Sequence, residues 1–177
     1  MPKKKKKNYG KMFEQDFLES AVKQNMLVER EKDNAAYFST TKNPYDFRIY
    51  EYPNIFYIEL KSTGGSSISL QENIIRPHQI EQLYARTKFK GVYAGFLFEF
   101  RERKLKTKTT PHEVYYLSIQ NFLKKPPHTK TLSVDTVRSL GGIKIDANKK
   151  ISRYTMDVQK LISTLKKENK NKKKRAD

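Results

Sequence analysis

Two apolar segments constrain the fold more than any other feature of the sequence. Residues 91–100 (GVYAGFLFEF) and 112–123 (HEVYYLSIQNFL) carry aromatic and aliphatic side chains at both odd and even positions. In a strand these alternating positions face opposite sides of the sheet, so both sides need a covering layer. We therefore expect two central strands in a sheet that has other elements packed on both faces.

Three other segments have the apolar spacing of amphipathic helices: residues 8–25, 77–89 and 152–167. In the first helix Glu14 borders the apolar face, whereas Asp16 is expected to point away from it. Two short strands are predicted at residues 46–50 and 54–61, after a polar stretch at residues 29–42. The order of helix, strands, helix, strands and helix predicts an α/β fold, with a mixed central sheet flanked by helices.

The length of 177 residues suits one domain, and the 12% aromatic content separates the chain from disordered proteins. We predict a disordered basic arm at residues 1–8 and a single domain at residues 9–165. A loop region within that domain covers residues 24–43, and a basic tail covers residues 166–177.

Several classes of site are excluded by composition. The chain has no Cys, which rules out thiol catalysis, Cys-ligated zinc and disulfides. His78, His112 and His128 do not have the spacing of paired metal ligands. No apolar run follows the N-terminal lysines, so no signal peptide is expected and the predicted location is the cytoplasm.

The net charge of +18 is concentrated at the two ends of the chain. Residues 1–11 carry +6 and residues 166–177 carry +5, which leaves +7 on the remainder. Basic arms on a basic domain predict a polyanionic partner, and nucleic acid is favoured over a membrane because no amphipathic anchor is present. Solubilising tails are the alternative interpretation. The candidate DNA contacts are Lys3, Lys4, Lys5, Lys6, Lys7, Lys11, Arg30 and Arg101.

The predicted hairpin at residues 46–61 brings charged side chains together. A four-residue turn from Glu51 to Asn54 sets Asp46 directly opposite Glu59, and Lys61 follows on the same face of the strand. Opposed like charges are destabilising unless a cation joins them, and Mg²⁺ suits a pair of carboxylates. The alternative is that all three charges face solvent on a two-stranded edge, with Lys61 paired to Glu59, since a slip of one residue would separate the carboxylates.

The segments Pro44-Tyr45-Asp46 and Glu59-Leu60-Lys61 resemble the P-D…(D/E)-x-K signature of restriction-endonuclease-like nucleases. Together with GKMFEQDF, SISLQ, PHQIEQL and GVYAGFLFEFR, they resemble the RecU-type Holliday junction resolvases, particularly the short forms of phages and prophages. The resemblance covers roughly residues 8–123. It departs from the family in having Tyr45 between Pro44 and Asp46, and in a shortened stalk-like region at residues 24–43.

The resemblance implies a homodimeric endonuclease that needs Mg²⁺, or Mn²⁺ as a substitute, and cuts four-way DNA junctions without a small-molecule cofactor. By motif position Asp46 and Glu59 would bind the metal, Lys61 would aid attack on the phosphate, Gln79 would complete the metal shell and Glu14 would support the site. From the residues alone, a solvated residue at a helix start is the favoured interpretation of Gln79, and Glu14 could equally be a carboxylate that favours the helix N-terminus.

Three other functions stay open on the sequence. The first is a restriction-like or repair endonuclease acting on other DNA. The second is a non-catalytic DNA-binding module, and the third is a basic structural or ribosome-associated protein that binds RNA.

Overall fold

The computed structural model describes residues 8–31, 43–107, 109–151 and 153–173 of the chain. The lysines of the predicted N-terminal arm, most of the predicted loop region and the last four residues lie outside these ranges. Lys3, Lys4, Lys5, Lys6 and Lys7 are therefore candidate DNA contacts on sequence grounds alone.

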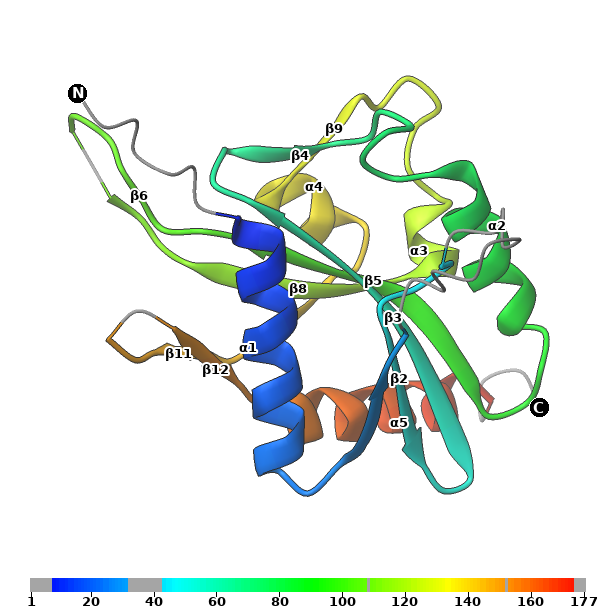
Figure 1. The fold of residues 1–177 in the computed structure, drawn as a ribbon. Helices are drawn as coiled ribbons and strands as arrows, with labels where there is room; N and C mark the ends of the chain where they lie inside the picture. The colour runs from blue at the N-terminus through cyan, green and yellow to red at the C-terminus, as the bar shows by residue number, and fades with distance from the viewer. Residues whose placement is uncertain (1–7, 32–42, 108, 152, 174–177) are drawn as a thin grey trace, which may run out of the picture.

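A six-stranded mixed sheet forms the centre of the molecule (Figure 1). Its strands, in spatial order, are β1 (Leu27–Arg30), β2 (Phe47–Glu51), β3 (Asn54–Thr63), β5 (Val92–Phe100), β8 (Glu113–Ser118) and β10 (Ile143–Ile145). The neighbours β3 and β5 are parallel, and the other neighbouring pairs are antiparallel. The two apolar segments supply β5 and β8, which lie inside the sheet as predicted.

Helices cover both faces of this sheet. One apolar cluster joins it to α1 (Tyr9–Lys23) and α5 (Val158–Lys173). A second cluster, on the opposite face, joins it to α2 (Pro77–Arg86), α3 (Ile119–Phe122) and α4 (Val134–Ser139). The predicted α/β fold with a mixed sheet flanked by helices is therefore confirmed. None of the helices in the described ranges is long and apolar enough to cross a membrane.

Three two-stranded sheets surround the central one. They are β4 (Ser67–Ser69) with β9 (Thr131–Ser133), β6 (Arg103–Lys104) with β7 (Thr109–Thr110), and β11 (Ala147–Lys149) with β12 (Tyr154–Met156). The β6–β7 and β11–β12 hairpins project from the same side of the molecule, on the left in Figure 1.

Several predicted boundaries were wrong because side chains cap helices or find partners far along the chain. The strand expected at residues 112–123 ends at Ser118, whose hydroxyl caps α3 by accepting from the Asn121 amide at 3.2 Å. Residues 154–156 form a strand, and the helix after them continues to Lys173, past the predicted domain end at residue 165. The polar stretch begins with β1, which pairs with β2.

The expectation that Asp16 points to solvent was also wrong. Its side chain is buried, where it forms an ion pair with Arg153 next to β12. Arg153 lies 137 residues away in sequence, so helical periodicity alone could not reveal this partner.

Candidate active site

The β2–β3 hairpin has the predicted register. Tyr50 pairs with Ile55, and Phe47 pairs with Ile58 as the last pair of the two strands. Asp46 lies one residue before this pair, and its carboxylate is close enough to Glu59 for its charge to act on that side chain. The Asp46 amide donates to the Ile58 carbonyl at 3.1 Å, which fixes the start of the hairpin. The solvent-facing edge of the alternative interpretation is wrong, because β3 lies between β2 and β5 and Glu59 is only 2% exposed. The ion pair that it expected is present, since Nζ of Lys61 lies 2.6 Å from Oε1 of Glu59.

The Asp46 carboxylate is held by the backbone of β3. Beyond Ile58 no residue of β2 remains to pair with β3, and the Leu60 amide donates instead to Oδ2 of Asp46 at 2.7 Å. Burial raises the pKa of Asp46, while the hydrogen bond from Leu60 opposes that rise. The carboxylate is thus fixed in orientation and partly desolvated.

Glu59 has one satisfied oxygen and one unsatisfied oxygen. Its Oε1 accepts from Nζ of Lys61 and from Nε2 of Gln79, both at 2.6 Å. Its Oε2 is buried and accepts no hydrogen bond, while a side-chain hydrogen bond from Glu59 lowers the pKa of the neighbouring Asp46. Burial, followed by the nearby charge of Asp46, raises the pKa of Glu59 to about 8. A buried carboxylate oxygen without a donor is costly, which makes this atom a strong candidate for binding a cation.

Gln79 is placed by the start of α2. Its Oε1 accepts from the Arg76 amide at 3.2 Å, so the side chain closes the first turn while its amide nitrogen reaches Glu59. Gln79 is 5% exposed, which is inconsistent with a solvated helix residue. In this orientation its oxygen faces the Arg76 backbone and its amide nitrogen positions Glu59. The role of Gln79 in a metal shell stays a prediction.

Glu14 reaches the same site from α1. It lies in the second turn of the helix, so the expected interaction with the helix N-terminus does not explain its position. Burial and then the Asp46 charge raise the pKa of Glu14, and an ion pair with Arg30 of β1 opposes that rise. Glu14, the predicted supporting carboxylate, and Arg30, a predicted phosphate contact, therefore both lie at the site.

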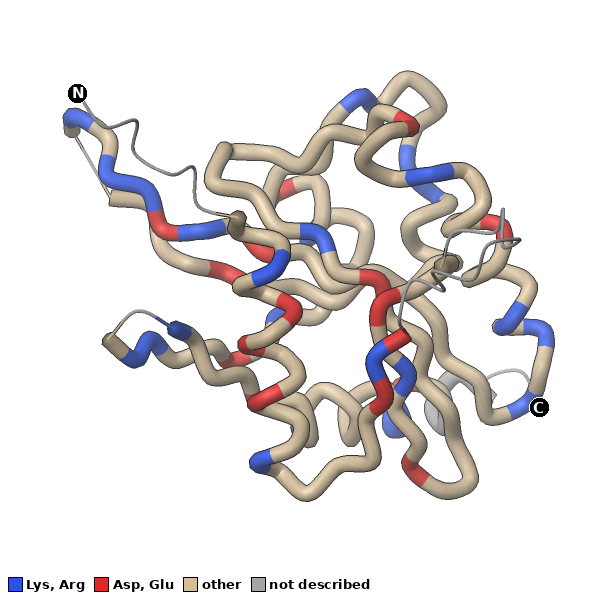
Figure 2. The backbone as a smooth tube through the Cα atoms, in the orientation of Figure 1, with Lys and Arg blue, Asp and Glu red and all other residues tan. Residues whose placement is uncertain are grey.

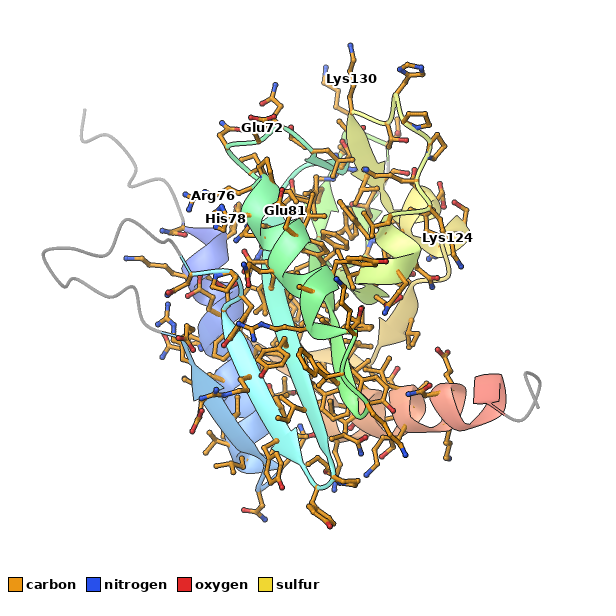
Figure 3. All side chains as sticks on the ribbon, turned by 90° about the vertical axis from the view of Figure 1, so that its right-hand side faces the viewer. Glu72, Arg76, His78, Glu81, Lys124 and Lys130 are labelled. Carbon is orange, nitrogen blue, oxygen red and sulfur yellow. The ribbon has the colours of Figure 1, made fainter. Side chains whose placement is uncertain are left out.

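These side chains line one cleft of about 480 Å³. Its walls are formed by Glu14, Arg30, Glu31, Asn43, Asp46, Glu59, Lys61, Asn73, Ile74, Arg76 and Gln79. The sequence reasoning did not single out Arg76, which caps α2 from the position just before Pro77. Figure 3 shows Arg76 beside His78 at the start of this helix. The sequence signal that could have identified Arg76 is its position directly before the helix that carries Gln79, a candidate site residue.

The residue added between Pro44 and Asp46 is anchored by aromatic contacts. The rings of Tyr45 and Tyr57 lie 4.8 Å apart, and the Arg86 guanidinium lies 4.9 Å and 4.4 Å from their centroids. Tyr45 is buried, so it adds packing directly next to Asp46. Contacts of this kind contribute about 0.5–2 kcal/mol each.

The donor set fits a hard divalent cation. Asp46 and Glu59 supply oxygens, and the two like charges favour a cation between them. Among the described residues no group of three or more His, Cys, Asp or Glu side chains has metal-binding geometry, so the protein ligands would be this pair. Mg²⁺ commonly binds one or two carboxylates and completes its shell with water and phosphate oxygens.

The predicted phosphate contacts differ in their surroundings. Lys11 is exposed in the first turn of α1. Arg101, by contrast, has protein partners: its side chain is 10% exposed and its Nε lies 3.0 Å from Oε2 of Glu99. The structure therefore favours an anchoring role for Arg101 over the predicted contact with DNA.

Comparison with known proteins gives a relative but no family. No protein-family model matches the chain. The SPbeta prophage-derived uncharacterized protein YotM of Bacillus subtilis (strain 168) is 37% identical over 121 residues, which cover 66% of this chain. These residues span 58% of YotM, so the match includes little more than half of that protein's length. Hjc, a Holliday junction resolvase from Archaeoglobus fulgidus, shows 17% identity and a TM-score of 0.48 over 76% of this chain and 95% of its own. A likeness at this level carries no conclusion about function.

Proposed function

We propose that this protein is a metal-dependent endonuclease that hydrolyses phosphodiester bonds in four-way DNA junctions. The observation that carries the proposal is the buried carboxylate of Glu59, whose unpaired oxygen lies in a cleft with Asp46 and Lys61. A cleft with two fixed carboxylates and a lysine, in a chain of net charge +18, suits a substrate made of phosphate diesters.

Asp46 and Glu59 would hold Mg²⁺, for which Mn²⁺ could substitute. The bound metal supplies a Lewis acid and an acidified water at neutral pH. Both carboxylates must be ionised for this purpose, so the proton that the raised pKa keeps on Glu59 has to leave when the site is loaded.

Lys61 has a separate role in the proposed reaction. Its Nζ lies 2.6 Å from Oε1 of Glu59, which holds the ammonium group at the cleft with its side chain 18% exposed. An ammonium group at this position can bind a phosphate oxygen and stabilise the negative charge that develops on it. Arg30 and Arg76, on the cleft walls, would orient the neighbouring phosphates.

The four-way junction as substrate is supported by the resemblance of the sequence motifs to RecU-type resolvases. A junction has to be cut on two opposed strands, and a homodimer with two-fold symmetry places two sites against such a substrate. The relative from a prophage agrees with the resemblance to short phage forms, although that relative is itself uncharacterised.

Cleavage of a labelled four-way junction and of linear duplex, each with Mg²⁺ and with EDTA, tests the proposal. We expect the wild type to nick opposed strands of the junction only with metal, and Lys61→Ala to bind the junction without cutting it. Equal cutting of the linear duplex would indicate a restriction-like or repair enzyme. Binding without cutting by the wild type would indicate a non-catalytic module.

A further inference from the structure

The β6–β7 hairpin leaves the central sheet at the end that carries the candidate active site. In the parallel pairing of β3 with β5, Lys61 lies opposite Phe98 and Thr63 lies opposite Phe100. The chain then passes directly from Phe100 into the hairpin, and the Arg101 amide donates to the Thr63 carbonyl at 3.0 Å. The root of the hairpin is therefore only a few residues from Lys61 along the neighbouring strand.

The hairpin is strongly basic. Residues 101–112 contain five Lys and Arg against a single acidic residue, Glu102, for a net charge of +4. Lys104 and Lys106 are exposed and have no ion pair in the part of the chain that the structure describes. Leu105, between them, is 43% exposed. Figure 2 shows these basic positions along a hairpin that projects away from the body of the molecule.

The root of the hairpin is rigidly anchored. On one strand the Arg101 guanidinium lies 4.9 Å from the ring of Tyr9 and 5.7 Å from that of Tyr154, and pairs with Glu99. On the other strand His112 stacks on Tyr154, with centroids 3.5 Å apart, and its Nε2 lies 2.9 Å from Glu99. These contacts hold the two ends of the hairpin, just outside β6 and β7, against α1 and β12.

The single acidic side chain of the hairpin is neutralised by the neighbouring hairpin. Oε2 of Glu102 lies 3.0 Å from Nζ of Lys149, on β11. This ion pair joins the two projecting hairpins and leaves a positive electrostatic potential on the solvent side of the β6–β7 hairpin. A preorganised basic surface binds a polyanion with less loss of conformational entropy than a flexible tail does.

We propose that the β6–β7 hairpin binds the sugar–phosphate backbone of a duplex DNA arm that leads away from the cleft. A two-stranded β-ribbon is narrow enough to enter the major groove, where lysines on its sides reach the phosphates. Lys104 and Lys106 make these contacts, and Leu105 lies at the floor of the groove. The inference rests on the proposed function, because it assigns the path of the DNA beyond the site of cleavage.

The test is binding of a fluorescently labelled duplex and of a labelled four-way junction, in EDTA, over a range of salt concentrations. The hairpin variant is Lys104→Ala with Lys106→Ala. The matched control is Lys124→Ala with Lys130→Ala, two exposed lysines on the side that Figure 3 turns toward the viewer, away from the hairpin. Thermal melting checks that both variants fold, and Lys106→Ala alone replaces the double variant if that one melts early.

Two lost phosphate contacts reduce the slope of log K against log salt by about 2, since each contact contributes about 0.9. Between 50 mM and 200 mM salt, the wild type should then lose about tenfold more affinity than the hairpin variant. The control should keep the wild-type slope. Equal slopes for the hairpin and control variants overturn the proposal, even if the wild type cuts junctions. Tighter binding of an RNA duplex than of DNA also overturns it. If the wild type never cuts DNA but the hairpin variant has a smaller salt slope, the DNA-binding role of the hairpin is supported and the proposed nuclease activity is refuted.

Discussion

Replacement of Glu59 by Gln should stabilise the metal-free protein at alkaline pH. Glu59 is buried, and its pKa is raised from 4.5 to about 8 by burial and by Asp46. The folded protein therefore keeps a proton that the unfolded chain loses, and its stability falls as the pH rises between these two values. Below pH 4.5 the ionisation of Glu59 does not lower the free energy of unfolding, and above about pH 8 it lowers that free energy by its full amount.

The size of the effect follows from the shift in pKa. Each unit corresponds to about 1.4 kcal/mol, so a change from 4.5 to about 8 sets a ceiling of about 5 kcal/mol. Entry of water around the ionised carboxylate reduces this value, and we expect a gain of about 2–4 kcal/mol for Glu59→Gln. Gln has the shape of the protonated side chain, so the variant and the wild type should be about equally stable near pH 4.5.

Urea unfolding in EDTA, across this pH range, measures the difference in the free energy of unfolding between the two proteins. Groups that do not interact with Glu59 titrate alike in both proteins and cancel in that difference, whereas the titration of Asp46, whose charge acts on Glu59, contributes to it. Glu81→Gln is the control, because Glu81 is exposed on α2 (Figure 3). A difference that stays constant with pH, or a variant that is the less stable protein above pH 8, would refute the assignment of Glu59 as a buried carboxylate whose ionisation destabilises the fold.

Three further predictions concern the same part of the fold. Mg²⁺ at one hundred times its Kd should stabilise the wild type by about 2.7 kcal/mol in thermal melts and leave Glu59→Gln unchanged, whereas equal stabilisation would place the metal elsewhere. Gln79→Ala should lower the free energy of unfolding by about 1–3 kcal/mol, because Glu59 loses a donor and α2 loses the link to Arg76; an unchanged urea midpoint would contradict this. Gly95→Ala should cost about 2–3 kcal/mol in the same assay, because its Cβ would lie 2.4 Å from the Leu117 carbonyl oxygen, and a neutral effect would show that β8 can shift.

The centre of the fold could be predicted from the sequence because its determinants are local. The alternation of side chains in residues 54–61 and the four-residue turn at their start fix the register of β2 and β3. This register brings Asp46, just before β2, to the cleft that Glu59 also lines. Likewise, apolar residues at both odd and even positions of β5 and β8 indicate burial on both faces, which the two clusters confirm.

The parts that could not be predicted depend on contacts between distant segments. Arg101 resembles a surface arginine in sequence, yet Tyr9 and Tyr154 enclose it from opposite ends of the chain. The resemblance of the sequence motifs predicts Gln79 as a site residue. Its side-chain orientation depends on the hydrogen bond from the Arg76 amide, and a sequence motif does not encode that bond. Side-chain patterns specify which face of a helix or strand is buried, but not which polar residue of a distant segment contacts that face.

The hydrogen bond from the Leu60 amide to Asp46 also completes the hydrogen bonding of β3. Past the last residue of β2, the Leu60 amide would otherwise be a donor without an acceptor on the unpaired edge of a strand whose side chains are buried there. The Asp46 carboxylate supplies that acceptor. A variant that removes it, such as Asp46→Ala, loses this hydrogen bond as well as a proposed metal ligand, and Asn is the replacement that retains an acceptor for Leu60.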